Sequence, residues 1–550
     1  MAELRRIGRP GWVAAPVAIA VLATIPIAAL ATSVLRPNRE VWRQQWDTRL
    51  PDQIVTTVSL TVGVVTASVV LGVGLAWLVD AHRFPGRSVL SWALVLPLAM
   101  PGYILGFVTT ATFGVAGPVQ VWWRDHLGRD AWFPEVRSLP GAIFTLTLTL
   151  YPYVYLLARA ALRDQTATAT LVARTLGASR SEAARRVVLP MLRPAVAAGA
   201  AIVAMETLTD FATVQYFNLE TITVGVFRIW RGSYDRDAAS EIATLVLVFA
   251  LFAIALERVL RGRARFSDSG GEAAAAVEPM ALRGWRAIAA TTTASLVVMV
   301  AFVAPTLRLA SWAVAEQRSV RGTPMVERYV DFLGNSLTLT AVTIVICLLA
   351  SALVANSHRF TTAGIVRYAA RISIVGYAVP GPVVAMGVVL TLVGLDDLLG
   401  AAGGDLPGFA ATGSFIALAY AYSIRFLAPG LTAVEAGIGQ VHVDVTSSAQ
   451  SLGASPMSVV RRIHLPLART SVLAAAVLVG VDALKELPIA YLLRPVGFDT
   501  LPVWVFDLAS ESRFEQAALP ALSIIAVALV PVALLSRHLD RSISDSRPHP

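Results

Sequence analysis

Three long uncharged runs limit what this chain of 550 residues can fold into. Residues 13–35, 54–79 and 517–536 contain no Asp, Glu, Lys or Arg. Each run offers about 20 or more residues, which is enough to cross a hydrocarbon core of ~30 Å as a helix. Lipid offers no hydrogen-bond partner to a backbone amide, so a segment that crosses it must be helical. The runs predict an all-α polytopic membrane protein.

Composition supports the same class. Hydrophobic residues make up 56% of the chain and charged residues 15%, whereas a soluble globular chain has about 25% charged residues. The net charge of +9 could suggest a nucleic-acid partner. The arginines lie mostly in short segments between apolar runs, however, where retention of positive loops in the cytoplasm explains them. We therefore expect a lipid bilayer as the surroundings and no nucleic-acid partner.

The apolar runs predict about twelve membrane helices. They are expected near residues 11–35, 54–79, 88–115, 139–163, 193–217, 238–260, 286–312, 335–356, 366–395, 409–434, 469–494 and 517–537. The polar segment 261–284 has the composition of a flexible linker and is predicted to lie in the cytoplasm. The predicted domains are a first half, 1–260, and a second half, 285–550.

Short strings recur between the two halves. His82-Arg83-Phe84 recurs as His358-Arg359-Phe360, and Leu176-Gly177-Ala178-Ser179 recurs as Leu452-Gly453-Ala454-Ser455, both at the same offset. Pro101-Gly102 recurs as Pro380-Gly381 at a slightly longer offset. The strings indicate an internal duplication. Because each half has an even number of predicted helices, the repeats are expected to be parallel, related by an axis along the membrane normal.

Arginine distribution predicts the orientation of the chain. With the N-terminus inside, the segment 159–193 is internal, and it holds Arg159, Arg163, Arg174, Arg180, Arg185, Arg186 and Arg193. Outer segments carry arginine mostly beside an acidic residue, as in Arg124-Asp125. The bias predicts cytoplasmic N- and C-termini.

The two longest inner segments, 164–192 and 440–468, contain the duplicated Leu-Gly-Ala-Ser string. Each is expected to form a short helix, a break at the glycine, a second basic helix, and then a Pro at the next membrane entry. Gly177 and Gly453 are expected to allow positive φ or a close approach of another backbone. Such a segment could dock on a soluble partner or lie among phospholipid headgroups. Two copies at one register favour a two-fold partner.

These segments resemble the EAA loop of permeases from ATP-binding-cassette (ABC) importers, and we call them the first and second EAA-type loops. The matching positions are Ala173, Gly177, Ala178, Val187, Leu189, Pro190, Ala449, Gly453, Ala454, Ile463, Leu465 and Pro466. The leading Glu of the family motif is replaced by Leu171 and Ser447.

In that family the loop couples the permease to an ATPase subunit. The resemblance therefore implies the type I ABC importer permease fold, two ABC ATPase subunits and an extracytoplasmic solute-binding protein. It also implies a multi-pass location in the bacterial cytoplasmic (inner) membrane.

Two further strings are similar to those of ferric-iron permeases. They are Met205-Glu-Thr-Leu-Thr-Asp210-Phe and Asp482-Ala-Leu-Lys485-Glu486-Leu-Pro488. The resemblance implies that ferric iron is moved inward by alternating access. Thiamine and polyamine permeases are relatives of that family, so those cargoes remain alternatives.

Four acidic residues in these strings are candidates for a pathway or gate. Glu206 and Asp210 are four residues apart and are expected to share a helix face; Asp482 and Glu486 take the equivalent places, beside Lys485. Charges at membrane depth usually face a bundle interior or a water-filled path, and oxygen ligands suit a small cation of high charge. Alternatively, the acids pair with Lys485 or with arginines and hold helices together. The seven histidines show no ligand spacing, so no fixed metal site is predicted.

No nucleotide-binding loop is predicted. A P-loop needs Gly-Lys followed by Ser or Thr, and the single lysine, Lys485, follows Leu484. The chain is therefore expected to be no enzyme and to bind no cofactor, while ATP is used by a partner subunit. One rival is a secondary transporter driven by an ion gradient, which would need no paired loops. Another is an intramembrane enzyme, but no nucleophile–base or metal constellation is present in the sequence.

Overall fold

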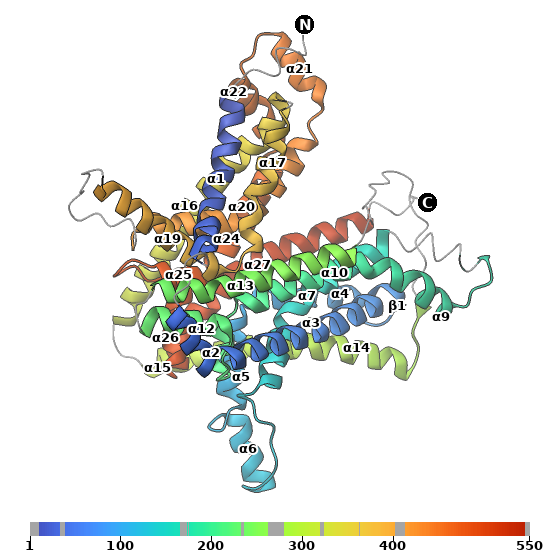
Figure 1. The fold of residues 1–550 in the computed structure, drawn as a ribbon. Helices are drawn as coiled ribbons and strands as arrows, with labels where there is room; N and C mark the ends of the chain where they lie inside the picture. Colours follow the sequence, from blue (N-terminus) through green and yellow to red (C-terminus); the bar gives the residue numbers. More distant parts are fainter. Residues whose placement is uncertain are drawn as a thin grey trace. The chain divides into compact units, whose positions relative to one another are not determined.

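The computed structural model describes residues 10–33, 39–164, 173, 175–232, 236–261, 280–319, 324–361, 363–401 and 413–544. Regular structure in these residues is helical apart from two short strands (Figure 1). Up to residue 261 the elements are α1 Pro10–Ser33, α2 Arg39–Thr48, α3 Leu50–Ala81, β1 His82–Arg83, α4 Arg87–Ala93, the 3-10 helix η1 Leu96–Ala99, α5 Gly102–Phe113, α6 Pro118–Leu127, α7 Leu139–Asp164, α9 Arg180–Ala183, the π-helix η2 Ala184–Val188, α10 Leu189–Thr209, α11 Ala212–Tyr216, α12 Ile222–Gly232 and α13 Arg236–Arg261.

The remaining elements follow the predicted linker, of which residues 262–279 lie outside the described residues. They are β2 Met280–Ala281, α14 Trp285–Val298, the π-helix η3 Met299–Val303, α15 Ala304–Ser319, α16 Pro324–Phe360, α17 Gly364–Ser373, α18 Val375–Ala378, α19 Gly381–Ala401, α20 Phe415–Gly439, α21 Val443–Ser451, α22 Pro456–Val459, the π-helix η4 Val460–His464, α23 Leu465–Leu467, α24 Arg469–Lys485, α25 Pro488–Leu493, α26 Leu501–Ser510 and α27 Phe514–Ser544.

Many of these helices are long and apolar enough to cross a membrane. Within the described residues nine stretches meet both criteria, and a tenth forms if α22–α23 and α24, which meet at a 79° bend, are one broken span. Shorter apolar stretches, Ser240–Phe252 and Phe514–Val530, lie in α13 and α27, at the predicted positions 238–260 and 517–537. The prediction of an all-α polytopic protein is confirmed.

Two predicted helices are broken at equivalent places. The predictions of single helices over 88–115 and 366–395 are wrong, because the chain is extended just before Pro101 and just before Pro380. Met100 has φ −97° and ψ 104°, and Val379 has φ −96° and ψ 129°. A proline ring clashes with a helical residue in front of it and forces that residue out of the α region. Helices α5 and α19 then restart at the following glycines.

The helices form two compact units that each draw on both sequence halves. Unit 1 consists of residues 1–47, 225–247 and 322–504, and unit 2 consists of residues 48–224, 248–321 and 505–550. The first long helix of the first half, α1, thus belongs to unit 1, which holds most of the second half. The first long helix of the second half, α14, belongs to unit 2, which holds most of the first half. The division of the sequence at 261–284 remains a prediction.

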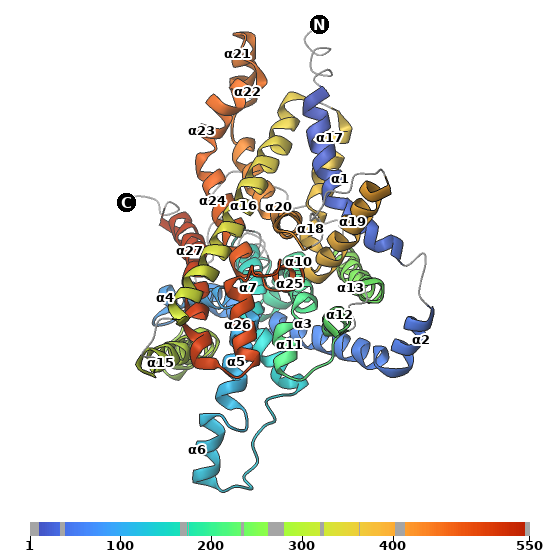
Figure 2. The same ribbon diagram turned by 90° about the vertical axis from the view of Figure 1, so that its left-hand side faces the viewer.

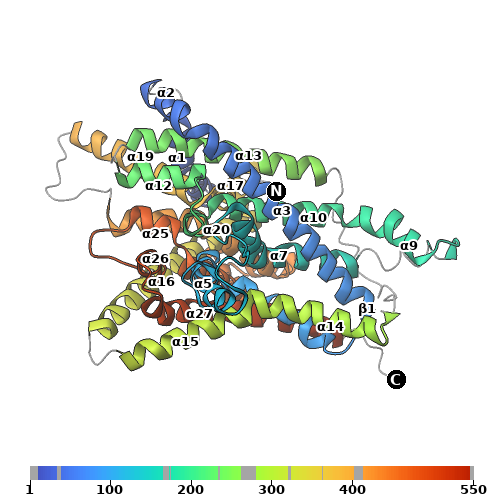
Figure 3. The same ribbon diagram turned by 90° about the horizontal axis from the view of Figure 1, so that it is seen from below.

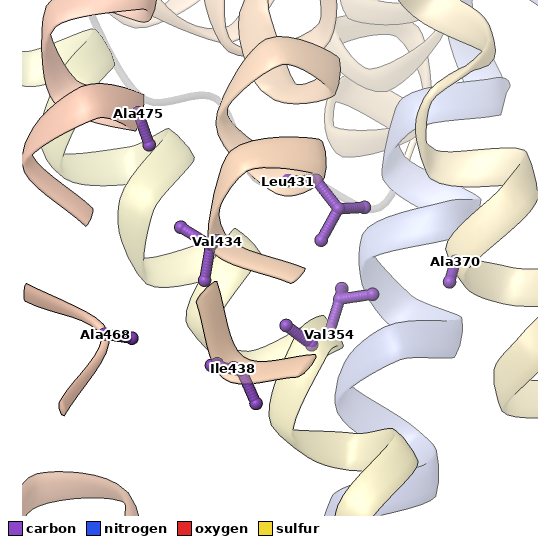
Figure 4. Close-up of a cluster of buried hydrophobic side chains, with 8 residues drawn as sticks. Val354, Ala370, Leu431, Val434, Ile438, Ala468 and Ala475 are labelled. Atoms are coloured by element: carbon purple, nitrogen blue, oxygen red, sulfur yellow. The ribbon is translucent and has the colours of Figure 1, made fainter. Parts of the chain in front are cut away.

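In unit 1, α1 packs on helices from the second half. Figure 4 shows a buried apolar cluster of that unit, made by α16, α17, α20 and α24, and Ile19 of α1 packs against it. The Tyr420 hydroxyl donates to the Leu22 carbonyl at 2.5 Å, and Gly387 leaves room for the Pro26 carbonyl. Helices α1 and α17 lie side by side (Figure 2).

Unit 2 is centred on α7, with α3 and α10 against it. Gly72 of α3 and Gly199 of α10 both face Val154, and a Cβ on either would lie within 3 Å of that valine. Small residues allow helices to approach closely in a membrane. From the second half, Trp312 of α15 and Phe514 of α27 stack with ring centroids 5.7 Å apart.

The duplication extends to single hydrogen bonds. The Ile222 amide donates to Thr57 Oγ1 at 3.0 Å, and the Leu501 amide donates to Ser336 Oγ at 2.8 Å at the equivalent place in the second repeat. Asn218 and Gly497 are also equivalent, and both have positive φ, of 56° and 81°. Each repeat therefore keeps the same turn in its own unit.

Candidate functional site

Both EAA-type loops contain the same left-handed turn. Gly177 has φ 91° and Gly453 has φ 87°, so the prediction of positive φ is confirmed. One residue after each glycine, the amide of Ala178 donates to the Ala173 carbonyl and that of Ala454 to the Ala449 carbonyl, both at 3.0 Å. This bond between residues five apart, around a left-handed glycine, closes the end of a helix and turns the chain sharply.

The helix after the turn is also identical in register. The hydroxyls of Ser179 and Ser455 accept the amide hydrogens of Glu182 and Ser458, each at 3.3 Å, and so cap α9 and α22. Each of these short helices runs directly into a π-helical turn, η2 or η4, and the two turns occupy equivalent positions in the repeats. Leu-Pro follows this π-turn directly in both loops, since Val188 and His464 before it are themselves helical in φ and ψ.

A buried polar network anchors the second loop. His464, the last residue of η4, is fully buried; its Nδ1 lies 2.5 Å from Asn356 Oδ1, and its Nε2 lies 2.8 Å from Thr446 Oγ1. Its ring stacks on Phe360, which in turn packs against Trp12 of α1 with centroids 4.7 Å apart. The second loop is thereby tied to α16 and α1 within unit 1.

The first loop is anchored by apolar contacts instead. Val188 stands where the second loop has His464, and it packs with Ala161, Leu192 and Trp77. On the adjoining helices, Asp80 and Arg159 form a buried ion pair at 3.3 Å. Asp80 corresponds to Asn356 at the offset of the Leu-Gly-Ala-Ser strings. One repeat therefore uses an ion pair where the other uses a histidine network.

A leucine next to each glycine is highly exposed. Leu176 is 83% exposed and Leu452 is 89% exposed. Because the same exposed apolar side chain recurs at the equivalent position of the other repeat, the two leucines are candidates for contact with another protein. Sequence reasoning quoted both leucines as part of the repeat but did not select them as candidates, although their recurrence beside a break in the helix was the available signal.

The membrane carboxylates lie differently from the sequence prediction. Helix α10 ends at Thr209, and Asp210 is extended, with φ −79° and ψ 101°. Its Oδ1 accepts the Thr213 amide at 2.8 Å and its Oδ2 accepts the Thr213 hydroxyl at 2.5 Å. The prediction of one helix over 193–217 is wrong, because the Asp210 side chain takes a backbone donor of α11 and the chain leaves the helix there. The Asp210 amide still donates to the Glu206 carbonyl at 3.1 Å, so the two acids stay one helical turn apart, as predicted.

Glu486 repeats this arrangement in unit 1. It follows the last residue of α24 with φ −70° and ψ 119°, and its Oε1 accepts the Ile489 amide at 3.2 Å in α25. A Cβ on Gly381, at the start of α19, would lie 3.0 Å from that Oε1; a Cβ on Gly102, at the start of α5, would lie 2.5 Å from Asp210 Oδ2. Each acid is therefore placed near the first turns of two helices, where backbone amides favour negative charge.

Lys485 and Asp482 form an ion pair at 2.8 Å, and both side chains are about one quarter exposed, 27% and 26%. The alternative that Lys485 pairs with one of the acids is thus realised for Asp482. In the first half the place of Lys485 is taken by Thr209. Each acid pair lies in its own unit, so their arrangement around a common axis stays a prediction. In the described part of the chain, His, Cys, Asp and Glu form no group of three that could hold a metal ion.

Comparison with known proteins finds a family match in each of the two repeats. The family described as "Binding-protein-dependent transport system inner membrane component" matches residues 42–265 and 348–545. The Fe(3+)-transport system permease protein FbpB 2 of Haemophilus influenzae is 23% identical over 89% of this chain and 90% of its own length. The sulfate transport system permease protein CysT of Salmonella typhimurium is 27% identical over 44% of this chain and 89% of its own.

Among solved structures, a bacterial ABC transporter involved in the import of the acidic polysaccharide alginate is similar at 19% identity. It covers 47% of this chain and 96% of its own, with a TM-score of 0.36.

Proposed function

Since this chain belongs to the family of binding-protein-dependent transport system inner membrane components, we propose that it is the permease through which an ABC importer moves ferric iron into the cytoplasm. Family membership itself makes the chain a multi-pass inner-membrane permease subunit rather than an enzyme. ATP hydrolysis belongs to separate ATPase subunits, and a periplasmic binding protein delivers the cargo.

The coupling part of the proposal rests on the two EAA-type loops. Each loop presents an exposed leucine beside a left-handed glycine, followed by the same capped helix and π-turn. Identical local geometry in two repeats suits two identical partner surfaces. We assign one ATPase subunit to the loop around Gly177 and another to the loop around Gly453, with both loops and both chain termini in the cytoplasm.

The cargo part of the proposal rests on the similarity to the Fe(3+)-transport permease, which extends over 89% of this chain and so includes both repeats. The carboxylates add a second, weaker argument, because Asp210 and Glu486 stand at the ends of membrane helices in both repeats. Hydrogen bonds to the next helix already explain where these two carboxylates lie, so their positions do not require a bound cation. The choice of iron therefore rests on the similarity to the Fe(3+)-transport permease.

In the proposed cycle, closure of the ATPase pair moves the two compact units as rigid bodies and switches access from one side of the membrane to the other. This chain supplies the transport pathway and the two EAA-type loops on which the ATPase subunits act, and it performs no covalent step. The loops transmit the motion because each is tied to membrane helices, the second through His464 and the first through Val188.

Reconstitution tests the proposal. The full chain is placed in liposomes with its ATPase subunit and binding protein, and uptake of radiolabelled ferric iron is followed with and without ATP. We expect uptake that requires ATP and the binding protein, and no hydrolysis by the chain alone. ATP-dependent uptake of sulfate, thiamine or putrescine in place of iron would overturn the cargo only. Uptake that requires an ion gradient and does not depend on ATP would favour a secondary transporter.

A further inference from the structure

A groove of about 1100 Å³ runs between α3 and α14 in unit 2. Its walls are mostly small or aliphatic, including Ala67, Leu71 and Gly74 of α3 and Ala289, Ala290 and Thr293 of α14. Both helices are parts of stretches apolar and long enough to span the bilayer. The groove therefore opens in a region that lipid surrounds.

At one end of the groove a short clamp of two strands joins α3 to α14. There, β1 and β2 pair in parallel, with His82 opposite Met280, and the Leu282 amide donates to the Arg83 carbonyl at 2.9 Å. Figure 3 shows α3 running to β1, where α14 begins. Beyond this clamp, Gly74 has no described atom within 4 Å of where a Cβ would stand, so the described part of the chain leaves the space beside it open.

The clamped end of the groove is cationic and aromatic. His82, Trp285 and Arg286 line it. Trp285 is 74% exposed, and the Arg286 guanidinium carbon lies 5.8 Å from its ring centroid. An exposed tryptophan beside an arginine is typical of the depth at which lipid headgroups lie. Arg83 and Arg283 are exposed at the same clamp.

We propose that this groove binds one anionic phospholipid, with an acyl chain along α3 and α14 and the phosphate beside Arg286. An apolar channel with a single positive end matches the shape and charge of that molecule. Basic pockets between membrane helices favour anionic headgroups, at about fivefold in affinity per basic residue. The bound lipid fills the space between α14 and α3 and so completes the attachment of a second-half helix to unit 2.

Native mass spectrometry of the full chain, stripped of lipid and titrated with phosphatidylglycerol or phosphatidylcholine, tests the proposal. We expect one saturable phosphatidylglycerol and weaker binding of phosphatidylcholine. Arg286→Ala should reduce phosphatidylglycerol affinity about fivefold and reduce phosphatidylcholine affinity less, because the positive choline offsets the charge of its phosphate. Gly74→Phe should displace both lipids, because its ring occupies the groove.

Matched controls lie away from the groove. Arg137→Ala removes an exposed arginine before α7, and Gly334→Phe enlarges a helical glycine in α16 that also has no neighbour within 4 Å. Both controls should bind lipid as the unmodified chain does. If Gly74→Phe does not fold, judged by its thermal midpoint, Ala289→Phe fills the groove from the other wall.

Three results would overturn the proposal. Equal affinity for the two lipids in the unmodified chain would remove the role of the cationic end. Unchanged lipid binding in folded Gly74→Phe or Ala289→Phe would place the lipid elsewhere. A dimer of the chain that dissociates in those variants would mean that a second copy occupies the groove.

Discussion

Gly177 and Gly453 have positive φ, a backbone conformation that a side chain disfavours. Within the described residues, no atom lies within 4 Å of a Cβ at either position, so added bulk would meet no described neighbour. What excludes other residues is the positive φ itself, which costs a residue with a Cβ about 1–2 kcal/mol. Sequence reasoning could predict this turn because glycine, its neighbours and their repetition are all local signals.

Replacement of either glycine by valine should uncouple transport. A cost of about 1–2 kcal/mol shifts the loop population roughly tenfold, so Gly177→Val and Gly453→Val should each reduce ATP-driven uptake about tenfold. Gly177→Asn should retain more activity, because asparagine tolerates positive φ. Uptake is measured in membrane vesicles at matched protein levels. Gly364→Val is the control, since Gly364 has open space but no positive φ; valine variants with normal uptake would contradict the assignment.

Asp210 can be tested for its capping bond and its charge separately. Asp210→Ala removes the acceptor for the Thr213 amide and should lower stability by about 1 kcal/mol. Asp210→Asn keeps an oxygen for that amide and should retain both the thermal midpoint and uptake. Glu486→Ala and Glu486→Gln should behave in the same way in unit 1. A folded Asn or Gln variant that has lost iron uptake would instead show that the charge serves the cargo.

At the scale of elements, the apolar runs predicted where most helices lie but not where they end. The segment predicted at 139–163 is observed as α7, Leu139–Asp164. The breaks before Pro101 and Pro380 and after Thr209 and Lys485 lie inside runs that hydropathy reads as continuous. They depend on one steric clash or one hydrogen bond each, and an average over a whole membrane span does not register such a contact.

The ion pair between Asp80 and Arg159 links α3 to α7, and Arg159 also donates to the carbonyl of Ser91 in α4 at 3.1 Å. Both side chains are about nine-tenths buried, at 7% and 10% exposure for Arg159 and Asp80. Removing one charge of a buried pair costs about 3–5 kcal/mol, because the other charge remains in a medium of low dielectric.

Arg159→Met should therefore reduce the yield of folded protein severely, as seen by gel filtration. Adding Asp80→Asn removes the remaining charge and should recover part of that yield. Arg43→Met is the matched control, because Arg43 and Asp47 form an exposed pair at 3.8 Å, and such pairs contribute about 0.5 kcal/mol or less. Equal losses in the buried and exposed variants would contradict the role given to the buried pair.

For the whole molecule, the exchange of helices between sequence halves is the feature that no local pattern predicted. Periodicity and duplication divide the chain at 261–284, but α1 packs in unit 1 and α14, α15 and α27 pack in unit 2. Which unit receives a helix depends on contacts such as Tyr420 with Leu22 and Trp12 with Phe360. Those contacts join residues far apart in the sequence, so the composition of a helix does not predict the unit in which it packs.

A chain cut in the predicted linker tests this exchange. Fragments 1–260 and 285–550, expressed together, should co-purify, because each compact unit needs helices from both. Fragment 285–550 expressed alone should be degraded, since it lacks α1 and leaves apolar surface of α16, α17 and α19 uncovered. Fragment 34–260, which lacks α1, should rescue it less well than 1–260 does. The measurement is recovery of a tag on one fragment after purification through the other. Independent folding of each fragment, with no co-purification, would mean that the halves do not exchange helices, and equal rescue by the two first-half fragments would mean that α1 is not what unit 1 requires.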